Sequence, residues 1–225
     1  MRAEQPAALS GCYEAARAAA LSGVPLTTVY WWARHGIVVP SISPVREKLW
    51  SYADLMALRI VSWLRHPKVG DERPLPGSPM LDVRRALALL DDLGLDVWAG
   101  VEGGSPILVA PSGEIFVKAD GDVLNLHRQP VLMPAGALAL PAPFAAAGLH
   151  GPDLVRPPPH LRIIPAKVAG EPHLDGTRIT TQAVLALAAR GFSEQRIAEM
   201  YEVDSATVAE GIDLERELAG DLAAA

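Results

Sequence analysis

Cysteine is almost absent from this sequence: Cys12 is the one cysteine in 225 residues. A single cysteine excludes an internal disulfide framework and a zinc site built from several thiolates. Long hydrophobic runs are also missing, since Pro, Gly or charged residues interrupt each apolar stretch before the roughly 20 residues that span a bilayer. The first residues lack the apolar core of a signal peptide. We therefore expect a cytoplasmic protein that does not cross a membrane.

The residue patterns of common active sites are missing too. None of the six histidines pairs with another at the spacing of zinc proteases, and no Gly-x-Ser-x-Gly occurs. The glycine-rich stretch at residues 170–180, "GEPHLDGTRIT", lacks the Lys-Ser/Thr pair of a phosphate-binding loop. The sequence therefore predicts that the protein is not an enzyme and has no catalytic residues, metal site or cofactor.

Charge is present but unevenly distributed. Residues 11–68 contain seven Lys/Arg and three Asp/Glu, a formal charge of +4, whereas the rest of the chain contains 13 and 23, a charge of −10. Residues 150–225 alone carry seven Lys/Arg and twelve Asp/Glu, a charge of −5. This asymmetry predicts an anionic partner for the first segment, while the acidic last segment would repel a phosphate backbone.

The N-terminal segment has the pattern of a helix-turn-helix. Residues 13–21 are rich in alanine and predict a helix, and residues 22–24 contain the glycine of a tight turn. Pro25 suits the first position of a second helix, which we expect to run to about His35, and Gly36 suits the residue after its end. We expect Val29 and Trp32 on the buried side of this second helix.

A wing and a third helix are expected to follow. Residues 37–50 contain two prolines and two basic residues, and we expect them to be extended as a wing. Ser51 is a good N-cap for a helix over residues 52–65. Four residues at helical spacing predict one apolar stripe on that helix, namely Leu55, Leu58, Val61 and Leu64.

The central part changes from helical to strand-like patterns. After a linker at residues 66–79, Ser78 and Pro79 are expected to begin a helix that ends near Gly94. Short apolar runs separated by turn residues between residues 97 and 133 predict an antiparallel meander, with a hairpin at Asp120-Gly121. Residues 134–160 are rich in Pro, Ala and Gly, and we expect them to form a connection.

The C-terminal part predicts three helices. They begin near Thr181, after Ser193 and after Asp204, and either Thr177 or Thr180 can cap the first of them. The chain therefore predicts an α+β fold, mainly α. We expect a winged helix-turn-helix at residues 1–70, a helix with a small antiparallel meander and a linker at 71–160, and a helix-turn-helix-like domain at 161–225.

The N-terminal segment resembles the winged helix-turn-helix of the mercury-resistance-regulator (MerR) family. The matching stretches are "EAARAAALSGVPLTTVYWWARHGIVVP" and "WSYADLMALRIV". The long dimerising coiled coil and the C-terminal sensor of that family are missing from this chain, so ligand sensing does not carry over. The resemblance implies DNA binding through the second helix.

The C-terminal segment resembles the family numbered 433 among domains of unknown function. The matching pattern is Gly-x-Pro-x-x-x-Gly-Thr-Arg, followed by "GFS…I…Y". The pattern residues are Gly170, Pro172, Gly176, Thr177 and Arg178. Longer members with an N-terminal helix-turn-helix are similar to VapB-type antitoxins. The resemblance implies a type II toxin-antitoxin pair in which the chain neutralises a PIN-like ribonuclease toxin and represses its own operon.

Two sets of residues are candidates for these interactions. Side chains of the second helix enter the major groove in such motifs, while basic side chains elsewhere contact phosphates. The DNA-binding candidates are Arg17, Thr27, Thr28, Tyr30, Trp31, Arg34, Arg46 and Lys48. An arginine placed in the acidic magnesium site of the toxin would block it. The toxin-binding candidates are Arg178, Arg162, Arg190 and Arg196.

Three functions remain open at this point. The first is the antitoxin with operator DNA, the toxin and a second copy as partners, because DNA palindromes mirror two-fold protein dimers. The second is a stand-alone transcriptional regulator without a toxin. The third is an interaction scaffold that retains the helix-turn-helix for packing or dimerisation. For Arg178, pairing with an internal carboxylate or capping of carbonyl groups is an equal alternative to toxin binding.

Overall fold

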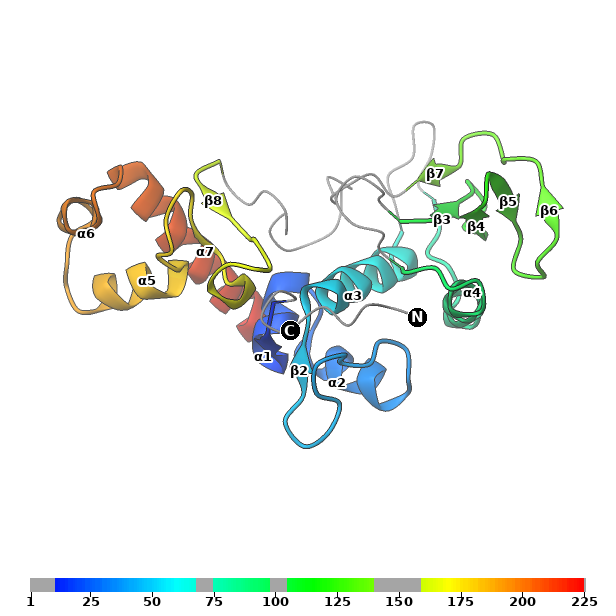
Figure 1. Ribbon diagram of the computed structural model, residues 1–225, viewed down its shortest axis with the longest axis horizontal. Helices are drawn as coiled ribbons and strands as arrows, with labels where there is room; N and C mark the ends of the chain where they lie inside the picture. Colours follow the sequence, from blue (N-terminus) through cyan, green and yellow to red (C-terminus); the bar gives the residue numbers. More distant parts are fainter. Residues whose placement is uncertain (1–10, 68–74, 98–104, 140–158, 225) are drawn as a thin grey trace. The chain divides into compact units, whose positions relative to one another are not determined.

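The structure is a computed structural model that describes residues 11–67, 75–97, 105–139 and 159–224. These residues form seven α-helices and nine short β-strands, an α+β fold (Figure 1). The chain divides into two compact units, and one of them is built from distant parts of the sequence. The first unit contains residues 1–34, 39–55 and 151–225, and the second contains 35–38 and 56–150. This grouping differs from the three successive segments expected from the sequence.

The N-terminal part of the first unit contains the two helices expected from the glycine turn. They are α1 (Ala15–Ser22) and α2 (Leu26–Arg34). Gly23 joins them with φ +66°, and its N–H donates to the carbonyls of Ala19 and Ala20. A left-handed residue after a helix favours glycine because it has no Cβ. The predicted turn is therefore confirmed, and it lets α2 pack against α1.

The sequence predicted that Tyr13 begins the first helix, but the structure places it in a strand. It belongs to strand β1 (Tyr13–Glu14), which pairs antiparallel with β2 (Leu49–Trp50). Within the expected extended wing, residues 37–50, β2 is the strand, and a backbone bridge between Ser43 and Leu49 closes the preceding loop. Tyr13 is 1% exposed, and its backbone hydrogen bonds to Trp50 replace those of a first helical turn.

The third helix, α3 (Tyr52–Arg65), begins with the predicted cap. Ser51 Oγ accepts from the Asp54 N–H at 3.2 Å, while the Ser51 N–H donates to the Asp54 carboxylate at 2.7 Å. This reciprocal arrangement is a capping box. The same carboxylate accepts two hydrogen bonds from Ser41, so the cap also fixes the start of the loop before β2. Burial raises the pKa of Asp54, although the hydrogen bonds from Ser41 and Ser51 act in the opposite direction.

The C-terminal part of the first unit holds a two-stranded sheet and three helices. The strands β8 (Leu161–Arg162) and β9 (His173–Leu174) are antiparallel. The helices are α5 (Thr181–Ala189), α6 (Glu194–Tyr201) and α7 (Ser205–Ala224). Thr180 caps α5 by accepting from the Ala183 N–H, and Ser193 caps α6 by accepting from the Arg196 N–H. Both capping predictions are confirmed.

The N-terminal and C-terminal parts of the first unit are in direct contact. A 3-10 turn at Val168–Gly170 lies beside β1, where the Cys12 N–H donates to the Ala169 carbonyl at 2.8 Å. The Tyr13 hydroxyl donates to the Gly170 carbonyl at 2.7 Å. In addition, α1 packs against α7. Helices α1 and α2 and the C-terminal helices therefore belong to one packed unit.

The second unit combines helices with a five-stranded antiparallel sheet. Helix α4 (Met80–Asp92) packs against strand β4, and the strand order is β6-β5-β4-β3-β7. The strands are β3 (Ile107–Val109), β4 (Ile115–Ala119), β5 (Asp122–Leu124), β6 (Pro130–Val131) and β7 (Leu138–Ala139). The predicted meander and its hairpin at Asp120-Gly121 are confirmed, since both turn residues have positive φ.

One expectation for the central part needs correction. Residues 138–139 form a strand, although they were expected in the connection at 134–160, whose residues 140–158 lie outside the described part of the chain. Helix α4 begins where the sequence predicted, directly after Ser78 and Pro79. The Ser78 hydroxyl donates to the Gly113 carbonyl at 2.8 Å. Pro79 occupies the N-cap position of α4.

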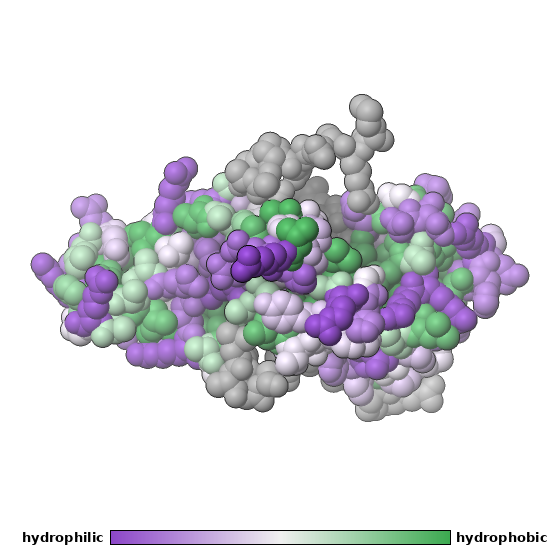
Figure 2. Space-filling view, turned by 90° about the horizontal axis from the view of Figure 1, so that it is seen from below, coloured by the Kyte–Doolittle hydropathy of each residue, from purple (hydrophilic) through white to green (hydrophobic). Residues whose placement is uncertain are grey.

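The surface mixes polar and apolar residues. On the face seen in Figure 2, hydrophobic and hydrophilic residues are interspersed. Of the helices formed by the described residues, none has the length and apolar character needed to cross a membrane.

Candidate functional site

Helix α2 presents one buried and one exposed side, as its residue pattern predicted. Val29 is fully buried and Trp32 is 5% exposed, so both anchor the helix to the first unit. The opposite side carries the predicted DNA-contacting residues. Thr27, Tyr30, Trp31 and Arg34 are exposed, while Thr28 is half-buried.

The loop before β2 brings basic residues to the same unit. The Lys48 ammonium donates to the carbonyls of Pro44 and Val45, at 3.0 and 3.1 Å. The Ser43 hydroxyl closes the loop further by donating to the Glu47 carbonyl at 2.6 Å. Arg46 is exposed on this loop. Because Lys48 is used within the loop, Arg46 is the better placed cation for an external phosphate.

A hollow lies between this loop and residues of β1, α1 and α2. Its volume is about 570 Å³, and its lining includes Tyr30 from α2, Glu14 from β1 and Arg46, Glu47 and Lys48 from the loop. The hollow brings the predicted residues Tyr30, Arg46 and Lys48 together. The two glutamates give this hollow mixed charge.

Arg17 requires a correction, because the structure gives it internal partners. Its Nε donates to Glu171 at 2.8 Å, and its two terminal nitrogens donate to the two carboxylate oxygens of Glu215 at 2.8 and 2.7 Å. The Arg17 side chain is 12% exposed. These contacts give Arg17 an internal role, contrary to the prediction that it binds DNA.

Fewer basic side chains of residues 11–68 are therefore exposed than the sequence contains. Arg17 is paired internally, and Arg59 is only 1% exposed. Arg34 and Arg46 remain exposed. These two arginines are the main candidates for contacts with a DNA backbone or base edge.

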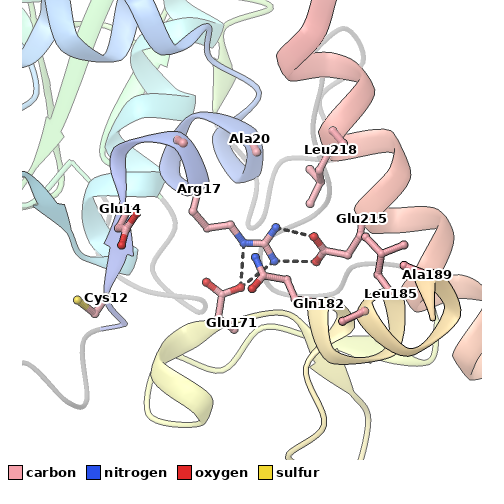
Figure 3. A pocket seen from close by; sticks show the side chains of 13 residues that line it. Cys12, Glu14, Arg17, Ala20, Glu171, Gln182, Leu185, Ala189, Glu215 and Leu218 are labelled. Carbon is pink, nitrogen blue, oxygen red and sulfur yellow. Dashed lines mark hydrogen bonds and ion pairs between the residues drawn. The ribbon is translucent and has the colours of Figure 1, made fainter. Parts of the chain in front are cut away.

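The buried arginine forms the floor of a second, larger pocket (Figure 3). This pocket has a volume of about 730 Å³ and lies between α1, α5 and α7. Arg17, Glu171 and Glu215 meet at its floor, and Cys12 and Glu14 lie at one end. The remaining lining residues are Ala16, Ala20, Gln182, Leu185, Ala186, Ala189, Leu218 and Ala219. We refer to it below as the interhelical groove.

Burial and charge both act on the groups at this floor. Burial disfavours the charged form of Arg17, but the hydrogen bonds and charges of Glu215 and Glu171 outweigh it and raise its pKa. The Thr181 hydroxyl also donates to Glu215, so this 6% exposed carboxylate is fully engaged. Burial, assisted by the negative charge of Glu171, raises the pKa of Tyr13.

Two of the four predicted toxin-binding arginines, Arg162 and Arg196, have partners within the protein. Arg162 is tied to Asp175 at 2.9 Å and to the carbonyls of Pro159 and Leu161. Arg196 is exposed and pairs with Glu199 one helical turn away. Arg162 therefore has a structural role in holding the β8–β9 corner.

Arg178 and Arg190 keep exposed guanidinium groups. Neither side chain makes an ion pair or hydrogen bond with any residue in the described part of the chain. Arg178 follows a turn in which Gly176 has φ +74° and Thr177 donates to the Leu174 carbonyl. The alternative that Arg178 pairs with an internal carboxylate is thus not seen among these residues.

The acidic surface expected on the last helix is only partly present. Asp213 and Glu217 are exposed on α7, whereas Glu215 points into the protein and binds Arg17. Glu210 is half-buried and accepts from His160 at 2.8 Å.

Sequence reasoning missed the Arg17–Glu171–Glu215 cluster because the two glutamates lie 154 and 198 positions after Arg17 along the chain. One signal was available. On α7, Glu215 lies seven residues after Val208 and three before Leu218, so it falls within the apolar stripe. A charged residue within an apolar stripe needs an internal partner of opposite charge.

No metal centre is found within the described part of the chain, where no three His, Cys, Asp or Glu side chains are close enough to bind one.

Comparisons with known proteins find a family match in the C-terminal segment and a solved structure with a similar fold. Residues 162–213 match the family described as "Protein of unknown function (DUF433)", so a domain of this family lies there. The crystal structure of Rv2018 from Mycobacterium tuberculosis has a similar fold, with a TM-score of 0.51 and 19% sequence identity. That match covers 95% of this chain and 100% of Rv2018. A search of curated proteins finds no match.

Proposed function

We propose that this chain is the antitoxin of a type II toxin-antitoxin pair. In this proposal it binds and neutralises a PIN-like ribonuclease toxin and, as a cytoplasmic homodimer, represses its own operon by binding DNA. The exposed side of α2 supports the proposed DNA binding. The resemblance of the domain combination to longer VapB-type antitoxins supports the proposed toxin binding.

The α2 surface has the chemistry of a major-groove reader. Arg34 has five N–H donors, which suit a guanine edge or a phosphate, and Thr27 lies on the same exposed side. Tyr30 and Trp31 are 44% and 43% exposed, so both aromatic rings present surface to a partner. Arg46 adds a cation from the neighbouring loop. MerR-like DNA binding is the function that best accounts for this side.

A salt series on DNA binding tests this half. The full chain is titrated into labelled DNA from upstream of its own gene and into a scrambled duplex, with fluorescence anisotropy as the readout. We expect tighter binding to the upstream DNA and a steep loss of affinity as salt rises, because counterions are released from phosphates. Arg34→Ala should weaken specific binding by about 1–3 kcal/mol. Arg216→Ala, another exposed arginine, is the matched control. Equal affinity for both duplexes would exclude specific DNA recognition.

The alternative is a stand-alone DNA-binding regulator without a toxin. The same α2 surface favours it, since DNA binding is common to both proposals. The gene neighbourhood separates them, because an antitoxin is encoded beside its toxin. A small PIN-like reading frame next to this gene supports the antitoxin, and co-purification of the two products would establish the pair. A neighbourhood without such a frame favours the regulator.

A further inference from the structure

The interhelical groove is a concave surface that the proposed DNA contacts do not use. Its walls come from α1, α5 and α7, which belong to the same unit. Four exposed alanines line it, two of them on α5. These residues are Ala16, Ala186, Ala189 and Ala219. Alanine side chains on facing helices leave room for another backbone to approach closely, and Leu185 and Leu218 supply larger apolar contacts.

The charge of the groove is negative. Three carboxylates and one guanidinium line it, so its formal charge is −2. These groups belong to Glu14, Glu171, Glu215 and Arg17. The Arg17 nitrogens are directed at Glu171 and Glu215, so the cation is already neutralised from within. The exposed Glu14 side chain forms no ion pair with any described residue.

The acceptors that remain at the floor favour a cationic ligand. Both recorded bonds to the Glu171 carboxylate use its Oε2 atom, which leaves Oε1 as an acceptor. Gln182 is exposed at the groove and adds an amide. A partner that fits must combine an apolar surface for the alanines and leucines with a basic group for these acceptors.

We propose that the interhelical groove is the docking site for an amphipathic helix of the toxin, one with an apolar face and a lysine or arginine directed at Glu14 and Glu171. This inference rests on the proposed antitoxin function and names the contact surface within it. The apolar wall seats the helix, as in other helix-in-groove complexes. The charge complementarity selects a basic helix, which is the reverse of the sequence-based expectation that antitoxin arginines reach into the toxin.

The location of the groove would link toxin binding to the DNA-binding segment. Arg17 is on α1, the first helix of the helix-turn-helix, and it bonds to Glu215 on α7. A helix seated on this floor contacts both elements at once. Toxin docking would therefore occur within the unit that carries α2. Glu14 and Ala16 line both this groove and the hollow that contains Tyr30, so the two surfaces adjoin.

The test blocks the groove and leaves the DNA-binding side intact. The affinity of the full chain for the PIN-like product of the adjacent gene is measured by isothermal titration calorimetry, for wild type and for Ala186→Arg. The variant fills the groove from α5 with a cation of the same sign as the expected ligand. Ala206→Arg is the matched control, because Ala206 is an exposed alanine of α7 that does not line the groove.

We expect Ala186→Arg to weaken toxin binding at least about tenfold, while Ala206→Arg binds as wild type does and all three proteins bind DNA equally. Glu14→Gln should weaken binding less, and added salt should reduce that difference. If Ala186→Arg fails to bind DNA, Ala189→Arg, on the same wall, replaces it. Unchanged toxin affinity in the groove variant would overturn the groove assignment and leave the antitoxin function standing.

Two other outcomes decide against the proposal in different ways. If wild type does not bind the adjacent gene product, the antitoxin function itself fails. If Ala186→Arg converts a dimer of the chain into a monomer in sedimentation, the groove holds a second copy, and its assignment to the toxin is wrong.

Discussion

Arg17 connects the N-terminal and C-terminal parts of the first unit. It bonds to Glu215 and Glu171, and the three side chains are 12%, 6% and 20% exposed. Removing one partner of a buried ion pair leaves an uncompensated charge, which costs about 3–5 kcal/mol. We expect Arg17→Ala to lower the free energy of unfolding by about that amount in urea denaturation.

The matched control for this prediction is Arg216→Ala, which should change stability by less than about 0.5 kcal/mol because both side chains of its ion pair are exposed. Arg17→Lys should restore only part of the loss, since an ammonium cannot make the two parallel bonds to Glu215. A loss as small as that of the control would contradict the structural role of Arg17.

His173 predicts a pH dependence of stability. Burial lowers its pKa below the ordinary value of 6.5, although its hydrogen bond to the Glu171 carbonyl acts the other way. Below pH 6.5 the unfolded chain binds this proton and the folded chain does not, so stability falls as the solution is acidified. In urea titrations between about pH 7 and pH 5, His173→Phe should lose less of its stability than wild type. Equal pH slopes for both proteins would show that His173 does not titrate on unfolding.

At the scale of elements, the turn at Val168–Gly170 holds β1 in place through a close contact. A Cβ on Gly170 would lie 2.2 Å from the Tyr13 hydroxyl oxygen, and the φ of Gly170 is +83°. Gly170→Ala therefore combines a steric clash with left-handed backbone strain of about 1–2 kcal/mol. Gly176→Ala carries similar strain at φ +74° with nothing within 4 Å. Thermal denaturation should show Gly170→Ala as the less stable variant, and equal melting temperatures would contradict the close contact.

The elements that sequence predicted well are those determined by neighbouring residues. The glycine turn at Gly23, the cap at Ser51 and the hairpin at Asp120-Gly121 each depend on a few adjacent positions. The division of α2 into buried and exposed sides follows from its helical period. Local patterns carry this information because capping and turn geometry involve residues one to four positions apart.

The features that sequence did not predict depend on distant contacts. Tyr13 was expected in a helix, but it pairs with Trp50 and bonds to Gly170. Arg17 was expected on the DNA surface, but its partners are on the C-terminal side of the chain. Local propensity reflects neighbouring residues alone and does not register a partner more than 150 residues away. The predictions for Tyr13 and Arg17 therefore followed from their immediate neighbours.

At the scale of the molecule, the N-terminal segment does not stand alone. Its α1 packs on α7, and its β1 is bonded to the turn at Val168–Gly170. We expect a fragment of residues 1–70 to lose helical circular dichroism and upstream DNA binding, because α1 then exposes its apolar side and Arg17 loses both partners. Co-expression with residues 151–225 should restore both signals. A fragment that folds and binds DNA by itself would show that the sequence-based boundary at residue 70 defines an independent domain.

The central claim is that this chain neutralises a nuclease, and a ribonuclease titration tests it most directly. The PIN-like product of the adjacent gene is assayed on RNA with Mg²⁺ while the full chain is added in steps. We expect cleavage to fall to background as the chain reaches stoichiometric amounts. Cleavage that continues unchanged in a molar excess of the folded, DNA-binding chain would contradict it.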